Sequence, residues 1–205
     1  MTTISIVGTG NMAAAIATRA AQHGHTIELV SRNRAKAQTL AQQIGHGATA
    51  GEFGATPAGE IVVIAVPHTA AVDVVTQFGD TLAGKILVDI TNPFNADGTG
   101  VVTTVGNSVA QQIAAAAPTS AQTVKAFNML FRGVIAAGTP VDVFFAGGSP
   151  DARARFAAFL ESLDFRARDA GGLEMTYALE WASITLMGLA RNGAGFDMAL
   201  ATEKL

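Results

Sequence analysis

The chain has 205 residues, of which 49% are hydrophobic and 14% are charged, and its formal net charge is −3. This length and hydrophobic content predict one compact globular unit with a sizeable core. The lack of a basic charge excess argues against nucleic acid as a main partner. No apolar run has the length that spans a bilayer, so we expect no membrane segment. The chain contains no cysteine, which excludes thiolate chemistry and is compatible with a reducing compartment. No signal peptide pattern is visible, so we expect a cytoplasmic protein.

The most informative segment is residues 4–13, where a β-branched run meets a Gly-x-Gly-x-x-Ala turn and continues into an alanine-rich helix over 12–22. Gly8 permits the tight turn, and Gly10 lets the backbone approach a pyrophosphate. Ala13 is small enough for close packing of helix on strand. The helix would present free N–H groups to the phosphates. An ordinary strand-to-helix turn is the alternative, but the context favours a dinucleotide site.

The second predicted strand, 26–30, indicates which dinucleotide binds. NAD-binding chains carry an acid at the end of this strand for the ribose 2′-hydroxyl, whereas an arginine accommodates a 2′-phosphate. Here Glu28 lies inside the strand, and Ser31, Arg32 and Lys36 follow it. A hydroxyl, a planar guanidinium and a further cation form a phosphate site. We therefore predict NADP(H) as the cofactor.

A simpler interpretation of the same segment is that Ser31 or Asn33 caps the next helix. Arg34 and Lys36 would then be solvated on its first turn. Basic residues at a helix N-terminus oppose the helix dipole, and this interpretation leaves that cost unexplained.

Strand and helix patterns alternate along most of the chain. Further helices are predicted over 34–44, 69–78, 107–117 and 149–163, and further strands over 60–66, 85–90, 123–127 and 141–146. Ser149 is the expected cap of the last of these helices, with Pro150 at its first position. This alternation predicts an α/β fold with a doubly wound parallel sheet of the Rossmann type. We expect an NADP-binding domain over 1–148 and a small C-terminal helical segment over 149–205.

The helix predicted over 173–191 has apolar residues on more than one face. One face carries Leu173, Tyr177, Trp181, Ile184 and Gly188, and another carries Met175, Leu179, Ala182, Leu186 and Leu189. A helix that is apolar nearly all round is buried. It either packs on the sheet, or turns one face to a second subunit or a ligand, with Leu186 as the position expected to contact the partner.

In an open parallel sheet, ligands bind outside the carboxyl ends of the strands. The residues at these ends contain no Ser-His-Asp set, no paired carboxylates and no clustered metal ligands, so we expect no metal. His68 is the one histidine there, a candidate hydrogen-bonding group or proton donor, although the start of a helix explains it equally well. Lys125 and Asp89 lie within strands and are interpreted as structural. The lack of an acid–base pair suits direct hydride transfer between two cofactors, with positioning supplied by the protein.

Taken together, these motifs make the chain similar to the F420-dependent NADP reductases (coenzyme F420:NADP oxidoreductases) over essentially its whole length. The resemblance rests on Gly8-Thr9-Gly10-Asn11-Met12, Ser31-Arg32 with Lys36, Val66-Pro67-His68, Thr91-Asn92-Pro93 and Lys125-Ala126-Phe127-Asn128. It implies that residues 9–12 contact pyrophosphate and that Ser31, Arg32 and Lys36 contact the 2′-phosphate.

The resemblance also implies that Pro67 and His68 line the nicotinamide side, with the deazaflavin F420 stacked in an apolar pocket nearby. Room for this second ring is expected near Pro67, Asn92 and Phe127. The implied cofactor-binding set comprises Gly8, Thr9, Gly10, Asn11, Met12, Ser31, Arg32, Lys36, Val66, Pro67, His68, Asn92, Ala126 and Asn128. Family members are cytoplasmic homodimers that pair through C-terminal helices.

Three other functions remain open from the sequence. The chain could be an NADPH-dependent reductase of a small carbonyl or imine, since its opening is also similar to that of pyrroline-5-carboxylate reductases, which carry a longer helical domain. It could reduce a flavin or ferric iron, as does the cytosolic domain of membrane ferric reductases. It could also be a non-catalytic NADP sensor that recruits a protein partner.

Overall fold

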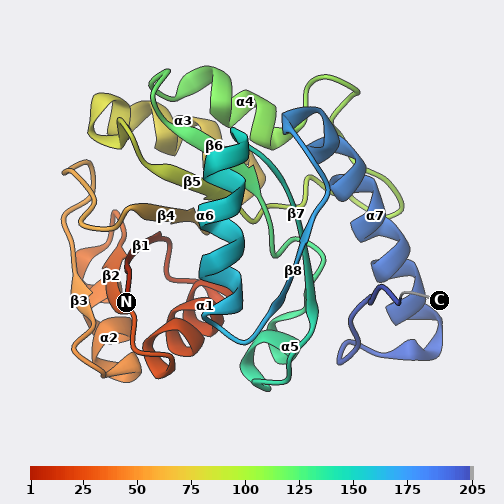
Figure 1. Cartoon of the computed structure of the whole chain (residues 1–205), viewed down its shortest axis with the longest axis horizontal. Helices are drawn as coiled ribbons and strands as arrows, with labels where there is room; N and C mark the ends of the chain where they lie inside the picture. Colours follow the sequence, from red (N-terminus) through yellow and green to blue (C-terminus); the bar gives the residue numbers. More distant parts are fainter. Residues whose placement is uncertain (204–205) are drawn as a thin grey trace.

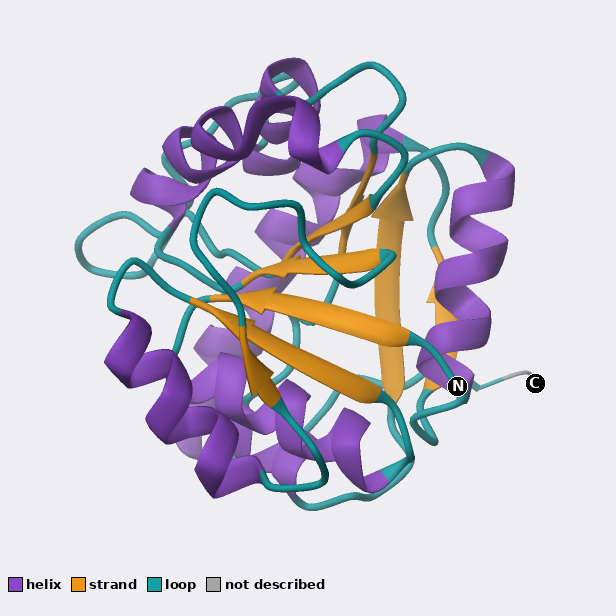
Figure 2. Ribbon diagram, turned by 90° about the vertical axis from the view of Figure 1, so that its left-hand side faces the viewer, coloured by secondary structure: helices purple, strands orange, loops and turns teal. Residues whose placement is uncertain are grey.

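The computed structural model describes residues 1–203, in which an eight-stranded sheet is covered by helices on both faces (Figure 1, Figure 2). In their order across the sheet, the strands are β3 (Thr49–Ala50), β2 (Thr26–Val30), β1 (Thr3–Val7), β4 (Ile61–Ile64), β5 (Ile86–Asp89), β6 (Gln122–Lys125), β7 (Asp142–Gly147) and β8 (Arg166–Asp169). The first six follow the order of a dinucleotide-binding sheet, with the switch point between β1 and β4. The predicted Rossmann-type fold is confirmed.

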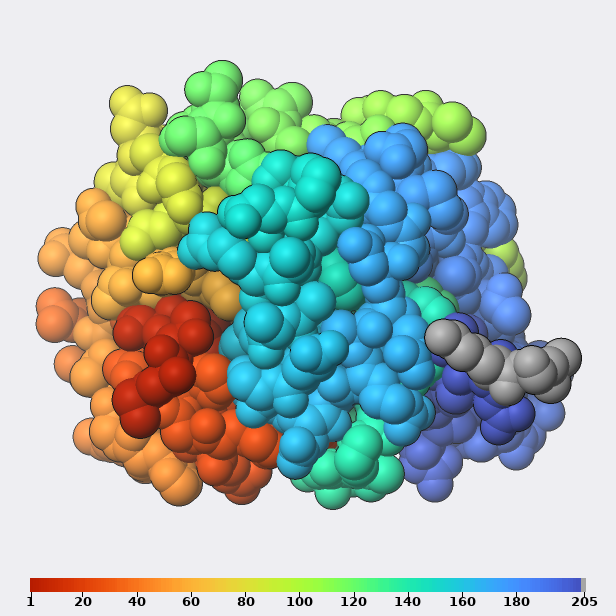
Figure 3. Space-filling model, in the orientation of Figure 1, coloured from red at the N-terminus to blue at the C-terminus, as the bar shows by residue number. Residues whose placement is uncertain are grey.

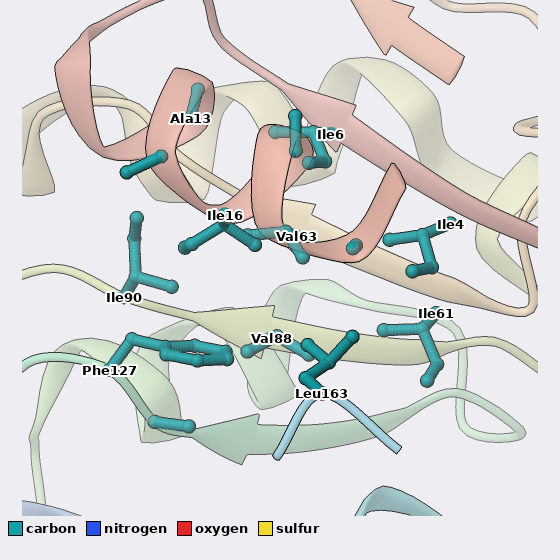
Figure 4. Close-up of a cluster of buried hydrophobic side chains, with 14 of the residues drawn as sticks. Ile4, Ile6, Ala13, Ile16, Ile61, Val63, Val88, Ile90, Phe127 and Leu163 are labelled. Carbon is teal, nitrogen blue, oxygen red and sulfur yellow. The ribbon is translucent and has the colours of Figure 1, made fainter. Parts of the chain in front are cut away.

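The central strands have apolar side chains on both faces because helices cover both sides of the sheet. In β4, Ile61 and Val63 enter one core, while Val62 and Ile64 enter the other. Figure 4 shows the first of these cores, where Ile61 and Val63 lie with Ile16 of α1 and Val88 of β5. Such strands are continuous apolar runs in the sequence, which is why they could be predicted.

The helices divide between the two faces of the sheet and its far edge. They are α1 (Asn11–Gln22), α2 (Arg34–Ile44), α3 (His68–Phe78), α4 (Val109–Ala116), α5 (Arg132–Ala136), α6 (Pro150–Glu161) and α7 (Thr176–Leu189). Helices α1, α2, α5 and α6 contribute to one core, and α3 and α4 to the other. Figure 3 shows α6, in cyan, across the middle of one face, between the N-terminal strands and the blue C-terminal segment.

Strand β7 pairs antiparallel with β6, and β8 then pairs parallel with β7. The sheet is therefore parallel, as predicted, except for the pairing of β6 with β7. Only the five-residue α5 lies between β6 and β7, and an antiparallel neighbour needs no full crossover helix. Strand β8 is missed from the sequence because it reads Arg-Ala-Arg-Asp, whereas buried strands are apolar runs. Its arginines instead pair with buried Asp142 of β7.

Asp142 also fastens the last described residues to the sheet. Its carboxylate accepts hydrogen bonds from Arg168, Arg166 and both the backbone N–H and hydroxyl of Thr202. Burial raises the pKa of Asp142, but the hydrogen bonds from Arg168, Thr202 and Arg166 outweigh it and hold the pKa well below its usual range. The carboxylate is thus a fixed anchor between the sheet edge and the C-terminal segment.

The predicted C-terminal helix is present, with a 3-10 turn before it (Leu173–Met175) and a π-helical turn after it (Ala190–Ala194). Leu179 and Leu186 pack beside Ala146 of β7. Leu186 is only 2% exposed, so the expectation that it faces a partner is wrong. Trp181 and Leu189 are each 45% exposed. The helix therefore packs on its own sheet and still leaves an apolar face uncovered.

Candidate functional site

The turn from β1 into α1 can be made only with glycine at position 8. Gly8 has φ of +130°, and a Cβ there would lie 2.1 Å from the carbonyl oxygen of Ala65 on the neighbouring chain segment. Its N–H donates to the carbonyl of Val30 at 2.8 Å. Gly8 is thus wedged between the ends of β2 and β4. It holds the turn at the switch point of the sheet.

Gly10 is the residue just before α1, and its surroundings are open. A Cβ on Gly10 would meet no atom within 4 Å, and no side chain caps the helix. The backbone N–H groups of the first turn are therefore left without partners in the helix. Free N–H groups at the positive end of a twelve-residue helix form an anion site. The open approach at Gly10 fits a pyrophosphate against the backbone.

A cleft of about 360 Å³ lies beside this turn, at the carboxyl ends of β1, β4 and β5. Its lining residues are Gly10, Asn11, Met12, Ala13, Ala65, Val66, Pro67, His68, Ile90, Thr91 and Asn92. Seven of the residues predicted from the sequence are therefore gathered here. Thr91 was not in the predicted set, although it follows a buried strand directly. Its hydroxyl is buried and has no hydrogen-bond partner among the described residues.

A second hollow of about 480 Å³ lies along the start of α2, on the β2 side of the turn. Thr9, Asn33 and Lys36 are among its lining residues. Asn33 caps α2 by accepting a hydrogen bond from the N–H of Lys36 at 3.2 Å. Ser31 in turn accepts one from the N–H of Asn33. The capping interpretation of this segment is therefore correct for Asn33.

The cap does not account for the cations beside it. Arg32, Arg34 and Lys36 are exposed, and none forms an ion pair with any carboxylate within residues 1–203. The first turn of α2 holds no acidic residue. Positively charged side chains at the N-terminus of a helix are unfavourable unless an anion binds there, because that end of the helix dipole is also positive. The arrangement fits a phosphate group at the end of β2.

Glu28, the only acid in β2, is already engaged. Its carboxylate accepts hydrogen bonds from the hydroxyl of Ser5 and from the N–H of Ala58 at 2.9 Å. It also lies against Gly51, where a Cβ would come within 2.4 Å of its Oε1. Held within the sheet in this way, Glu28 is not placed to bind a ribose hydroxyl. This geometry supports the preference for a 2′-phosphate that the sequence predicts.

The end of β6 places its residues below the cleft surface. Ala126 is fully buried, and its backbone N–H donates to the carbonyl of Asp89. The ring of Phe127 lies in the core against Phe156 and Phe165, so it does not line a ring pocket as expected. Asn128 is buried and hydrogen-bonded to Asn92. Of the predicted residues on this strand end, none is among the lining residues of the cleft.

A buried ion cluster underlies the same edge of the sheet. The ammonium of Lys125 lies 2.7 Å from Asp89 Oδ2 and 3.2 Å from Glu180 Oε1 of α7, and all three side chains are fully buried. Lys125 also donates to the carbonyl oxygen of Thr91. Glu180 accepts the N–H of Val109 at the start of α4. The cluster fastens α7 and α4 to the strand ends, which fits the structural interpretation of Lys125 and Asp89.

The cleft offers little acid–base chemistry. His68, the first residue of α3, is the only ionisable side chain among its described lining residues. It forms no ion pair with any described carboxylate.

Residues 1–203 contain no group of three or more side chains suited to hold a metal ion. No helix in the same range is long and apolar enough to cross a membrane.

Comparison with known proteins shows which family the first 93 residues resemble. Residues 3–93 match the family model described as NADP oxidoreductase, coenzyme F420-dependent. A structure described as a putative F420-dependent NADP reductase from Arthrobacter sp. FB24 superposes with a TM-score of 0.86 and 23% identity, and each chain is covered completely. The expected resemblance to this family is confirmed.

Two further relatives carry different descriptions. A reductive aminase from Aspergillus terreus, solved in complex with NADPH, has a TM-score of 0.62 and 22% identity over 94% of this chain and 63% of that one. Metalloreductase STEAP3 from Rattus norvegicus is 27% identical over 190 residues, which are 90% of this chain. The chain spans only 37% of that curated relative. The names of these two proteins describe different reactions.

Proposed function

We propose that this chain, whose residues 3–93 carry the pattern of the coenzyme F420-dependent NADP oxidoreductases, transfers hydride between NADP(H) and the deazaflavin coenzyme F420. The observation that carries the proposal is the pairing of two sites across one glycine turn. One is the hollow along α2 that Lys36 lines, near the exposed Arg32. The other is the cleft at the ends of β4 and β5, where His68 is the one ionisable side chain among the described lining residues. This pairing suits a phosphorylated dinucleotide whose reactive ring faces a second ring.

The dinucleotide would lie across the switch point of the sheet. Arg32 and Lys36 would hold the 2′-phosphate at one end, and the backbone at Gly10 and the first turn of α1 would hold the pyrophosphate. The nicotinamide would then reach the cleft between Pro67 and Asn92. We orient the dinucleotide in this way because the proposed phosphate site lies on the β2 side of the glycine turn and the cleft lies on its β4 side.

The chain's contribution to the reaction is orientation. NADPH bound here would deliver hydride from C4 of its ring to C5 of the deazaflavin, with the accompanying proton taken from water, and leave NADP⁺. Holding two reactants in the correct geometry can supply roughly 7–11 kcal/mol of barrier lowering. Val66, Pro67 and Ile90 give the cleft an apolar wall, which excludes water from the reacting faces. No side-chain base is needed for this transfer.

An acceptor screen tests the proposal against the other reductase functions. NADPH oxidation is measured with F420, a free flavin, a ferric chelate, a small ketone and a cyclic imine, each at the same concentration. We expect turnover with F420 to exceed that with every other acceptor. Faster turnover with the imine, the ketone, the flavin or the ferric chelate would assign the chain to that reaction. Tight NADPH binding without turnover on any acceptor would favour the NADP sensor.

His68→Ala is expected to lower the rate of this reaction by about tenfold or less, because removal of a true general acid or base typically costs about 10²–10⁴-fold. Single-turnover kinetics with saturating NADPH give the rate of the chemical step. His46→Ala is the matched control, since His46 lies in the loop after α2 and outside the lining of the cleft. A loss of a thousandfold at His68 would contradict direct hydride transfer without an acid or base.

We also propose that the chain forms a homodimer through α7 and the segment after it. Four large apolar side chains are exposed here: Met175 by 38%, Trp181 by 45%, Leu189 by 45% and Phe196 by 54%. Two of them, Trp181 and Leu189, lie on α7, while Met175 precedes it and Phe196 follows it. Exposed apolar groups on neighbouring segments are typical of an interface. The proposed C-terminal helical segment would thus supply the contact between subunits.

Two substitutions on α7 separate dimerisation from folding. Trp181→Asp is expected to give a folded monomer, because Trp181 is exposed in the single chain. Leu186→Asp is expected to unfold the protein, because a charge would be buried beside β7 without a partner. Light scattering measures the mass, and circular dichroism measures the fold. A wild-type protein that is monomeric at micromolar concentration would contradict the proposed dimer.

A further inference from the structure

We infer that Asn128 is a positioning residue: it fixes the carboxamide of Asn92 so that one N–H and one oxygen lone pair remain available to a primary carboxamide in the cleft. The inference rests on the proposed function, in which that carboxamide is the one on the nicotinamide ring. It gives Asn128 an indirect role, whereas the resemblance places it in direct contact with the cofactor.

The hydrogen bonds determine the orientation of both side-chain amides. Asn128 donates from Nδ2 to the carbonyl oxygen of Leu179 at 2.9 Å. Asn92 donates from Nδ2 to the carbonyl oxygen of Asn128 at 2.7 Å. A backbone carbonyl can only accept, so the nitrogen of each amide must occupy these positions. The second N–H of Asn128 is then directed to Asn92 Oδ1 at 3.2 Å.

This arrangement leaves Asn128 no donor for a ligand. Its residue is only 4% exposed, and both of its N–H groups are engaged by Leu179 and Asn92. Asn92, in contrast, lines the cleft and uses one of its two N–H groups and one of its oxygen lone pairs. One N–H and one oxygen lone pair of Asn92 therefore remain unused on a fixed amide. A primary carboxamide offers the complementary acceptor and donor.

The backbone before Asn128 is held in a costly conformation. Phe127 has φ of +59°, in the left-handed region, where a bulky side chain is an outlier. Such a conformation costs about 1–3 kcal/mol and persists only where surrounding contacts impose it. The ring of Phe127 is fixed in the core by Phe156 and Phe165. The Oδ1 atom of Asn128 is also buried without a partner among the described residues.

Both unfavourable features are explained if the chain is shaped to present Asn92. The left-handed turn at Phe127 places Asn128 between α7 and the cleft. Asn128 is hydrogen-bonded to Leu179 of α7 on one side and to Asn92 of the cleft on the other. The carboxamide of Asn92 is thereby linked to the packing of α7. Fixing the carboxamide of the nicotinamide would also fix the plane of its ring, and so the face from which hydride leaves. If Asn128 only supported the packing of the chain, its loss would not affect recognition of the nicotinamide carboxamide.

The test compares NADPH with its 3-acetylpyridine analogue, which keeps the carbonyl oxygen but lacks the N–H groups of the carboxamide. Calorimetry measures both affinities, together with that of 2′-phospho-ADP-ribose, which lacks the ring. We expect the wild type to prefer NADPH by three- to tenfold, which is the size of one lost hydrogen bond. In Asn92→Ala and in Asn128→Ala the preference falls to about one. The affinity for 2′-phospho-ADP-ribose stays within twofold in both variants.

Gln112→Ala is the matched control, because Gln112 also donates a side-chain N–H to a backbone carbonyl, that of Asn107, away from the cleft. It keeps the wild-type preference. If Asn128→Ala weakens both dinucleotides equally, Asn128 is merely structural and the inference is overturned. If the wild type binds neither NADPH nor 2′-phospho-ADP-ribose, the proposed function fails, and the inference fails with it.

A measurement on the wild type covers the case in which Asn128→Ala does not fold. The side-chain amide resonances of Asn92, assigned by their loss in Asn92→Asp, are followed by nuclear magnetic resonance. We expect them to shift when NADP⁺ is added and to stay unchanged with 2′-phospho-ADP-ribose. Asn92 resonances that do not respond to NADP⁺ would overturn the inference.

Discussion

Gly10→Val is expected to lower the affinity for NADPH by about a hundredfold or more, since charge-assisted hydrogen bonds contribute about 1.5–3 kcal/mol each and several would be blocked. The substitution should leave stability nearly unchanged, because a Cβ on Gly10 meets nothing within 4 Å. The side chain would instead occupy the space where we place the pyrophosphate. Calorimetry with NADPH and thermal unfolding of the same samples check both expectations.

Two other glycines make this prediction specific. Gly133→Val, on α5, also adds a side chain in open space and should bind NADPH normally. Gly8→Ala should destabilise the fold by about 2–6 kcal/mol, the combined cost of a left-handed backbone and of overpacking. Its Cβ would collide with the carbonyl of Ala65. Unchanged NADPH affinity in Gly10→Val would show that the pyrophosphate lies elsewhere.

Arg32→Ala is expected to weaken NADPH binding by roughly ten- to a hundredfold, the loss of one charge-assisted contact of about 1.5–3 kcal/mol. Binding of NADH, which has no 2′-phosphate, should barely change. Arg32 is exposed and forms no ion pair with a described carboxylate, so the fold should not be affected. Calorimetry with both dinucleotides measures the four affinities.

Arg155→Ala is the control for this substitution. Arg155 is a surface arginine on α6 that pairs with Glu60, the residue before β4, at the opposite end of the strands from the proposed site. It should leave both affinities unchanged. Equal affinity of the wild-type protein for NADPH and NADH would contradict the assignment of a 2′-phosphate site at the end of β2.

Much of the fold is predictable because local signals agree with one another. The helix over Arg34–Ile44 has the bounds expected from the sequence, since Asn33 caps it and Gly45 ends it. Ser149 and Pro150 likewise begin α6 as predicted. Buried parallel strands are apolar runs, and their bounds are correct to within two residues. These elements also position the glycine turn, beside which we propose the dinucleotide site.

Three elements and the direction of one strand could not be predicted, because they depend on distant residues or are too short for a pattern. Strand β8 carries arginines that are stabilised by Asp142, 24 residues earlier in the chain, and β3 has only two residues. Helix α5 is too short for a periodic pattern. Strand β7 runs antiparallel to β6, and no local sequence pattern predicts the direction of a strand.

The same limit applies to the candidate site. Ser31, Arg32 and Lys36 follow one strand in the sequence, and their spacing alone indicates a phosphate site. That Glu28 is engaged by Ser5 is visible only once two strands are paired. Nothing near Asn128 in the sequence reveals that its amide holds Asn92, because the two lie 36 residues apart. Contacts across the sheet carry this information.

Transfer of label from NADPH to the deazaflavin tests the central claim most directly. NADPH deuterated at C4, prepared separately in each of its two stereoisomers, is mixed with oxidised F420 and the protein, and the products are examined by nuclear magnetic resonance. We expect one stereoisomer to deliver deuterium to C5 of F420 and the other to retain it on NADP⁺. Deuterium lost to water, or no transfer to F420 alongside rapid reduction of an imine, a flavin or ferric iron, would contradict hydride transfer between NADPH and the deazaflavin.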